Sequence, residues 1–343
     1  MNSDWRAFLE SLSAEIGNDS DVTFPAAQTD ADCILADLSY LGCIMVDGPD
    51  ARDFLQGQLT NDVRELSNRH TQLSGYCSPK GRMLANLRLI RLGERVLLQL
   101  PRNKVEAVLA RLRMFVLRAR AELQDLSDEL VAVGIAGPAA SAELGRFIDP
   151  LPELDNGLTQ ADALTVIRIP GSPPRYEIIG PANAVQEIWL GLAGRATPVA
   201  SAHWRLLDIR AGLPTIYPET TEVLVPQMAN MHLIDGVSFT KGCYTGQEVV
   251  ARMQYLGRLK RRMYLADVEA ATPPNPGDVL YSPDSHSKQA TGWVVNAERT
   301  GGNRYELLAV VETEAAEQNH VHLGPDGPTL TLKAPPYGFA AAD

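Results

Sequence analysis

The pattern of apolar and polar positions predicts helices alternating with strands over the first half of the chain. Residues 4–16 carry apolar side chains at helical spacing and stop at Gly17, which is typical of a short amphipathic helix. Residues 42–46 read as a strand. The following Gly-Pro-Asp at residues 48–50 favours the start of a helix that should end near residues 60–62.

Strands dominate the next segment. Residues 70–77, 83–90 and 95–100 read as strands separated by turns rich in glycine, and residues 103–119 read as a helix. The core face of that helix is carried by Val105, Val108, Leu109, Leu112 and Val116. Helices and strands in this order predict an α+β layer in which helices cover one face of an antiparallel sheet.

A similar order of elements recurs further along the chain, although no repeat is visible residue by residue. We expect strands at residues 130–136, 165–169 and 175–179, and helices at residues 138–147, 182–192 and 203–211. The passage that follows, residues 214–240, is unusually long for a connector. Its length makes it a candidate for function.

The C-terminal part reads as all-β and predicts a small barrel or sandwich. Its expected strands lie at residues 262–268, 279–282, 290–297, 305–311 and 329–334, between turns rich in proline, glycine and asparagine. We therefore predict a first α+β domain over residues 1–125, a second over residues 126–258 and a β-barrel over residues 259–343.

One octapeptide concentrates chemistry: residues 241–248 read Lys-Gly-Cys-Tyr-Thr-Gly-Gln-Glu. Thr245 and Glu248 have the spacing of a capping box, so a helix should begin at Thr245 and end near residue 257. Cys243 would then lie just outside the positive end of the helix dipole, two residues from the Lys241 ammonium, and both favour the thiolate. The alternative is that Cys243 is a small buried hydrophobe.

Charge and composition limit the functional classes. The 343 residues have a formal net charge of -11, which argues against nucleic-acid binding over the whole surface. Two cationic segments stand out nevertheless: residues 102–120 hold six cations against one acid, and residues 252–262 hold five against none. Either could attract an anionic ligand or RNA, or serve as an ordinary solvated face.

The four cysteines are widely scattered and form no C-x-x-C pair, which disfavours a zinc knuckle and a disulfide framework. The N-terminus lacks the pattern of a secretory signal, and the apolar run at residues 130–140 is too short to span a bilayer. We therefore expect a soluble, cytoplasmic protein with no membrane partner.

With these motifs placed, the chain resembles the YgfZ-type folate-binding proteins, relatives of the T-protein (aminomethyltransferase) of the glycine cleavage system. The resemblance covers residues 35–262 well and the C-terminal barrel by position and pattern. The octapeptide is the most specific motif. Supporting motifs lie at residues 54–62, 78–82, 225–228 and 236–239.

The resemblance implies an aminomethyltransferase-like fold: a ring of two interlocked, ferredoxin-like α+β domains and a barrel around a channel that holds tetrahydrofolate. Trp204 aligns with an aromatic position implicated in folate contact; its alternative role is a core anchor. Leu41 stands where relatives can have Trp, with Tyr40 beside it. The further expected cofactor-binding residues are Asn61, Asp62, Tyr244, Gln247, Glu248 and Arg252.

One departure from the T-protein bears on the chemistry. Where aminomethyltransferases carry paired aspartates that assist folate attack, this chain has Ala85 and Asn86, which cannot exchange that proton. The resemblance instead implies a folate-dependent accessory factor in which Cys243, with Lys241 beside it, serves the assembly or repair of iron-sulfur clusters. The enzymes served would include a tRNA methylthio-transferase, so the partners are iron-sulfur enzymes or their assembly machinery.

Two other interpretations stay open. A folate-dependent one-carbon transferase or demethylase acting on a small amine would need Tyr244, Glu248 or Asp62 as acid and base. Direct RNA binding through residues 252–262 is the weaker alternative, because aromatic residues are not interleaved with the cations there. Glu248 and Arg252, four residues apart on one helix, also have the spacing of an ion pair.

Overall fold

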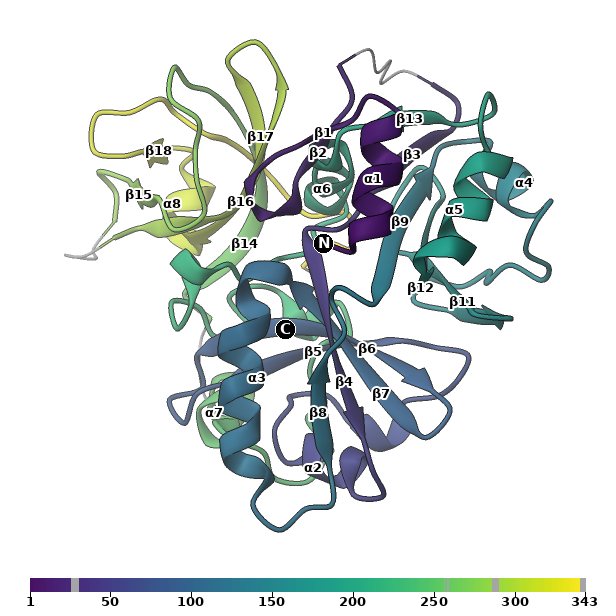
Figure 1. Ribbon diagram of the computed structural model, residues 1–343. Helices are drawn as coiled ribbons and strands as arrows, with labels where there is room; N and C mark the ends of the chain where they lie inside the picture. Colours follow the sequence, from purple (N-terminus) through teal and green to yellow (C-terminus); the bar gives the residue numbers. More distant parts are fainter. Residues whose placement is uncertain (26–30, 256, 258, 286–289, 340–343) are drawn as a thin grey trace. The chain divides into compact units, whose positions relative to one another are not determined.

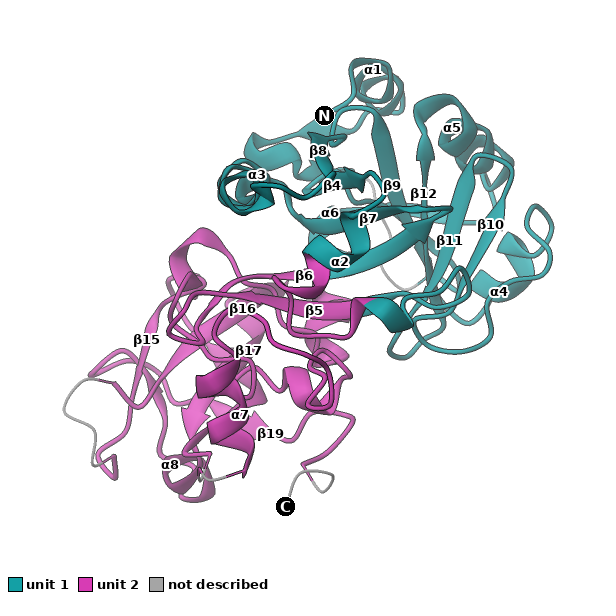
Figure 2. Ribbon diagram, turned by 90° about the horizontal axis from the view of Figure 1, so that it is seen from below, with its two compact units in different colours: residues 1–54, 64–72, 88–204 teal, residues 55–63, 73–87, 205–343 magenta. Residues whose placement is uncertain are grey.

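The computed structural model describes residues 1–25, 31–255, 257, 259–285 and 290–339 (Figure 1). The chain forms two compact units (Figure 2). Unit 1 comprises residues 1–54, 64–72 and 88–204, and unit 2 comprises residues 55–63, 73–87 and 205–343. The predicted α+β class is confirmed by the mixture of sheets and helices. The division into three domains stays a prediction.

Unit 1 contains a six-stranded sheet with the order β10-β11-β12-β9-β3-β13. Its neighbouring strands run antiparallel except for β13 and β3, which are parallel. The expected pairing of residues 165–169 with residues 175–179 is confirmed. The strands are β3 (Ile34–Asp37), β9 (Leu130–Ala136), β10 (Leu158–Ala161), β11 (Leu164–Ile169), β12 (Arg175–Pro181) and β13 (Thr197–Val199).

Aromatic residues join helices to this sheet. In α1 (Ser3–Ser11), Trp5 is buried and its ring centroid lies 5.6 Å from that of Trp189 in α5 (Ala182–Gly191). The prediction that this first helix extends to residue 16 is wrong. Ser13 adopts a left-handed φ of 64°, and the chain then forms β1 (Glu15–Ile16), which pairs with β2 (Val22–Thr23) across η1 (Asn18–Ser20).

A second group of strands in unit 1 lies beside helix α3 (Arg102–Val116). In it, β4 (Leu41–Asp47) pairs with β7 (Arg95–Pro101) and β8 (Glu122–Asp125), and residues 88–92 of β6 (Met83–Leu92) pair with β7. The predicted core face of α3 is confirmed at four positions, because Val105, Val108, Leu109 and Leu112 are buried. Helix α4 (Ala140–Leu144) is shorter than expected.

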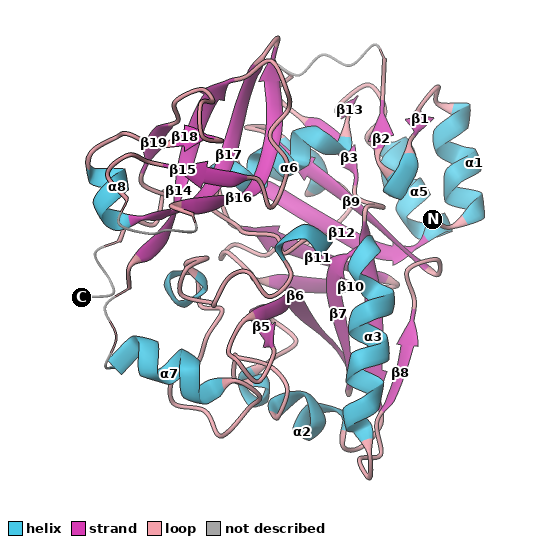
Figure 3. Ribbon diagram, turned by 90° about the vertical axis from the view of Figure 1, so that its left-hand side faces the viewer, coloured by secondary structure: helices cyan, strands magenta, loops and turns pink. Residues whose placement is uncertain are grey.

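Unit 2 ends in the predicted β structure, a curled sheet with the strand order β18-β15-β16-β17-β14-β19 (Figure 3). One face packs on a cluster of buried aliphatic residues that includes Leu280, Leu307 and Val311. The elements are β14 (Arg261–Glu269), β15 (Val279–Tyr281), β16 (Gly292–Gly301), β17 (Arg304–Glu312), α8 (Thr313–Glu317), β18 (His322–Leu323) and β19 (Thr331–Lys333).

The other core of unit 2 gathers the motifs that the sequence singled out. Cys77, Met83, Leu224 and Val250 belong to one buried cluster, together with residues of the curled sheet. The long connector at residues 214–240 contributes to it and contains only short 3-10 turns within its described length. The connector contains η3 (Pro218–Thr220) and η4 (Met231–Leu233), and α7 (Gln247–Tyr255) follows it. Four further elements have residues in both units: α2 (Ala51–Gln56), η2 (Val63–Glu65), β5 (Gln72–Cys77) and α6 (Ser201–Arg210).

Candidate functional site

Cys243 is the one exposed thiol among the four cysteines of the chain. Cys33, Cys43 and Cys77 are buried, and burial raises the pKa of their thiols to about 11, about 12 and about 12. These three groups therefore stay protonated at neutral pH and out of reach of a partner. The expectation that the reactive thiol is reachable is met at Cys243.

The Lys241 side chain has a structural task that its sequence context did not indicate. It is 6% exposed, and its ammonium donates to the carbonyl oxygens of Gln56 at 2.8 Å, Leu59 at 2.6 Å and Asn61 at 2.7 Å. It also lies 5.2 Å from the centroid of the Tyr244 ring. Three N–H donors meet three carbonyls, so the ammonium ties the loop before Cys243 to the motif at residues 54–62.

Within that motif, Asn61 and Asp62 both take part in the local hydrogen-bond network. Asn61 donates from Nδ2 to the carbonyl oxygens of Leu73 at 2.9 Å and Asp235 at 2.6 Å. Asp62 Oδ1 accepts from Gln56 Nε2 at 3.0 Å. These contacts fold the segment into a support for Lys241, and the predicted contacts of both residues with a cofactor stay predictions.

The helix after Cys243 begins at Gln247, two residues later than predicted. Gly246 precedes it with a left-handed φ of 84°, and a Cβ added there would lie 2.4 Å from the carbonyl oxygen of Ser78. Gly81 is equally close to α7, since its added Cβ would lie 2.7 Å from Val249 Cβ. Cys243 is therefore four residues from the helix, and the dipole acts on it less strongly than expected.

The other octapeptide residues divide by burial. Tyr244 is buried, and burial raises the pKa of its hydroxyl well above the ordinary value, so it stays protonated at neutral pH. Gln247 is half-buried at the start of α7, whereas Glu248 and Arg252 are exposed on it. Their spacing places Glu248 and Arg252 on one side of the helix. Their predicted cofactor contacts remain predictions.

Trp204 lies in unit 1 and is packed in its interior. It is 2% exposed, and the guanidinium of Arg175 lies 5.1 Å from its ring centroid. Gly134 makes room for the ring, because an added Cβ would lie 2.4 Å from Trp204 carbon atoms. The alternative role as a core anchor is therefore present. Its role in binding folate stays a prediction.

Within unit 2, the Asn86 side chain joins β6 to the backbone of the long connector and so forms a seam between the two segments. Its Nδ2 donates to the carbonyl oxygen of Pro214 at 2.7 Å, and its Oδ1 accepts from the amide of Ile216 at 2.8 Å. Its neighbour Ala85 is buried. The seam needs one donor and one acceptor, which an amide supplies and a carboxylate does not.

Two further buried polar residues were missed by sequence reasoning. Gln227 is buried and its Nε2 donates at 2.6 Å to the carbonyl oxygen of Val250, which fastens α7 to the long connector. Glu177 is buried in β12 of unit 1, where it accepts a hydrogen bond from Gln99 Nε2. A carboxylate within a strand whose burial pattern is continuous was the signal that could have found Glu177.

The cationic segment at residues 252–262 is only partly available for binding. Arg261 donates to the carbonyl oxygen of Ala290 and to Glu312, and Arg262 lies 5.3 Å from the centroid of the Phe339 ring. Arg258 lies outside the described residues. Two of the five cations are thus held by neighbouring side chains and carbonyls, which weakens the interpretation as an RNA surface.

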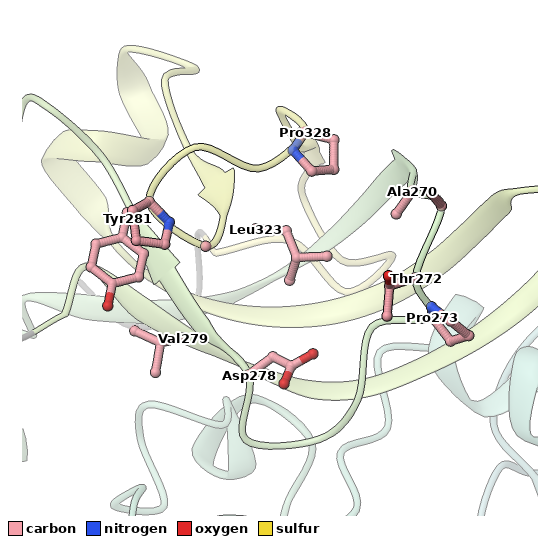
Figure 4. Close-up of a pocket in the computed structure, with 11 residues that line it drawn as sticks. Ala270, Thr272, Pro273, Asp278, Val279, Tyr281, Leu323 and Pro328 are labelled. Carbon is pink, nitrogen blue, oxygen red and sulfur yellow. The ribbon is translucent and has the colours of Figure 1, made fainter.

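Two cavities have no octapeptide residue in their lining. One, of about 360 Å³, lies in unit 1. Aliphatic residues form most of its lining, together with the charged residues Arg95 and Asp162. The other, of about 520 Å³, lies at the β15 and β18 edge of the curled sheet (Figure 4). Three prolines, Tyr281 and Asp278 line it, together with aliphatic residues. Neither cavity includes a residue predicted for the site.

Two features are absent from residues 1–25, 31–255, 257, 259–285 and 290–339. Within these ranges no group of three or more His, Cys, Asp and Glu side chains has the arrangement of a metal site. No helix in the same part of the chain combines the length and apolar character needed to cross a membrane.

Comparisons with known proteins agree with the octapeptide and the fold. The model of the GCVT N-terminal domain matches residues 21–169. The "tRNA-modifying protein YgfZ" of Edwardsiella ictaluri is 33% identical over 297 residues, which are 86% of this chain and 89% of that protein. The protein of the same name from Yersinia pestis is 30% identical over 317 residues, 92% and 96% of the two chains.

The fold itself matches that of an aminomethyltransferase. The crystal structure of the glycine cleavage system aminomethyltransferase T from Bartonella henselae aligns with a TM-score of 0.72 over 98% of both chains, at 19% identity. The predicted aminomethyltransferase-like fold is therefore confirmed. Because the two YgfZ proteins are at least 30% identical over most of their length, the chain belongs to the YgfZ family.

Proposed function

We propose that this protein takes part in tRNA modification as a folate-binding accessory factor for iron-sulfur enzymes, with Cys243 as its reactive group. The observation that supports this proposal most directly is a difference in burial between two residues of one short loop. Lys241 is buried and donates to three carbonyl oxygens, whereas Cys243, two positions later, is exposed. One constrained glycine, Gly246, follows the thiol and lies against the carbonyl oxygen of Ser78. A loop held this firmly presents its sulfur in one position to an incoming partner.

The proposal for iron-sulfur chemistry follows from the thiol. Thiolates are the usual protein ligands of iron-sulfur clusters, and a cluster needs more ligands than one cysteine provides. The remaining cysteines of this chain are buried. Cys243 would therefore supply one ligand, or one transferring thiolate, to a cluster held mainly by the partner enzyme.

Unit 1 contains buried acceptor groups and an aromatic ring whose chemistry matches the pterin of tetrahydrofolate. A pterin presents several N–H donors along one edge and a flat face, and the buried Glu177 and Gln99 offer oxygen acceptors. Trp204 is a flat aromatic side chain in the same unit. Residues Glu177, Gln99 and Trp204 would hold the pterin, and tetrahydrofolate would supply one-carbon chemistry when bound.

Replacing Cys243 with Ser tests the proposed role directly. In cells that lack the native protein, the Cys243→Ser variant should fail to restore methylthio-modified nucleosides in tRNA, as measured by mass spectrometry of digested tRNA. Ser11→Ala serves as a control, because it removes a polar group from the end of a surface helix. Both variants should be as abundant as the wild type. Full modification in the Cys243→Ser strain would reject the proposal.

A one-carbon transferase is the second candidate, favoured only by the aminomethyltransferase fold. Two side chains argue against this candidate, because neither can act as a base. Asn86 is an amide with both polar atoms hydrogen-bonded to backbone groups, and the Tyr244 hydroxyl stays protonated at neutral pH. Incubation of the purified protein with tetrahydrofolate and small amines checks it. Methylene-tetrahydrofolate formed equally well by the Cys243→Ser variant would favour the transferase.

A further inference from the structure

The outward face of α3 carries an apolar stripe that the core of unit 1 does not use. Ala107, Ala110, Met114 and Leu117, hereafter the outer stripe, are all exposed and follow one another at spacings of three, four and three. Met114 is 70% exposed and Leu117 is 85% exposed. At helical periodicity the stripe lies opposite the buried face of the helix. Folding of this chain therefore does not require these apolar side chains.

The backbone at the end of the stripe is strained. Leu117, at the C-cap of α3, has φ 46° and ψ -99°, in a region that bulky residues rarely adopt. Glycine is the usual residue at such a position, and it would relieve the strain. An exposed leucine held in a strained conformation points to a use outside the folded chain itself.

Cations border the outer stripe on both sides. Helical spacing places Arg111 along one side and Arg113 along the other, with Glu106 near the start. The exposed Arg118 follows the stripe directly in the chain. The Arg111 guanidinium lies 5.7 Å from the centroid of the exposed Phe115 ring, and Arg113 Nη2 donates to the carbonyl oxygen of Leu123. The first contact keeps the Arg111 guanidinium near an exposed ring, and the second ties Arg113 to β8. In a chain of net charge -11, this face is locally positive.

We propose that the outer stripe docks an acidic amphipathic helix of a partner protein. Spacings of three and four residues match the contact line of two packed helices, and Ala107 and Ala110 let the second helix approach closely. Carboxylates on both flanks of the partner helix would pair with the arginines.

Two other occupants fit this face less well. RNA would need aromatic side chains for base stacking, whereas the outer stripe contains none and the neighbouring Phe115 ring has the Arg111 guanidinium over it. A second copy of the chain would bring its own arginines against Arg111, Arg113 and Arg118, and like charges would repel.

A direct test uses three probes on the full-length protein: a labelled helical peptide with leucines along one face and glutamates on both flanks, the same peptide with lysines in place of glutamates, and unfractionated tRNA. The test variant is Met114→Glu with Leu117→Glu, followed by fluorescence anisotropy. Leu154→Glu is the matched control, because Leu154 is 76% exposed in the same unit and outside α3.

The glutamate peptide should bind the wild type and the Leu154→Glu control alike, and at least tenfold more weakly to the double variant. Added salt should weaken it further. Equal binding of the lysine peptide, or equal loss in the Leu154→Glu control, would overturn the proposal. Binding of tRNA alone through the stripe would assign the face to nucleic acid, and dimerisation lost in the double variant would assign it to self-association. Either result also overturns it.

Discussion

Two buried ionisable groups organise two loops of this protein in opposite ways. Lys241 in unit 2 donates to three main-chain carbonyls. Asp37 in unit 1 accepts from Trp5 Nε1 at 2.6 Å, from the Ser39 amide at 2.9 Å and from the Ser39 hydroxyl at 2.9 Å. The loop held by Lys241 ends in an exposed thiol, whereas the side chains around Asp37 are buried. A buried charged side chain with three hydrogen-bond partners thus supports an exposed thiol in unit 2 and stabilises the interior of unit 1.

The largest expected effect comes from removing the cation. Lys241→Met keeps the length of the side chain and leaves three carbonyl oxygens without their donor, which should cost about 3 to 5 kcal/mol in the free energy of unfolding. Hydrogen exchange of residues 55–63, compared with wild type, measures the loss within unit 2. Lys241→Arg keeps the charge and should lose less. Unchanged exchange in the methionine variant would contradict the structural role of Lys241.

Asp37 predicts that part of the stability of unit 1 depends on pH. Burial raises the pKa of Asp37 to about 6, although its three donors act against this shift. Between about pH 4 and pH 6 the folded protein therefore keeps a proton that the unfolded chain has released, so stability falls as pH rises through this window. The loss should be about 2 to 3 kcal/mol.

The matching measurement compares denaturant unfolding of wild type and Asp37→Asn at several pH values. His232 acts in the opposite direction over the same window, because burial lowers its pKa to about 4. Asp50 and Asp128 have lowered pKa values and act in that direction at lower pH, so the difference between the two proteins isolates Asp37. The variant should lack the decline between pH 4 and pH 6. Parallel curves for the two proteins would show that Asp37 has an ordinary pKa.

The substitution with the smallest expected effect on stability tests how the loop positions the Cys243 sulfur. Gly246→Ala puts a Cβ at a left-handed position against the Ser78 carbonyl, and it should cost about 1 to 3 kcal/mol. The loop must shift, so the rate at which Cys243 reacts with a small disulfide reagent should change. Gly242→Ala is the control, since an added Cβ there has nothing within 4 Å. Equal rates in all three proteins would show that the glycine does not set the position of the sulfur.

Periodicity predicted the strands and the core face of α3 because each depends on side chains that are read directly from the chain. It failed where backbone contacts decide. The start of α7 depends on how closely Gly246 approaches Ser78, and the role of Lys241 depends on carbonyls, which every residue has. The resemblance identified the motif at residues 54–62, but it did not indicate that carbonyl oxygens of this motif bind the Lys241 ammonium.

The amide of Asn86 limits which side chains this position accepts. It joins Pro214 and Ile216 with one donor and one acceptor, so a single change to aspartate would set a carboxylate against the carbonyl oxygen of Pro214. Aspartate at this position would therefore break the link between β6 and the long connector, even though the two side chains have nearly the same shape.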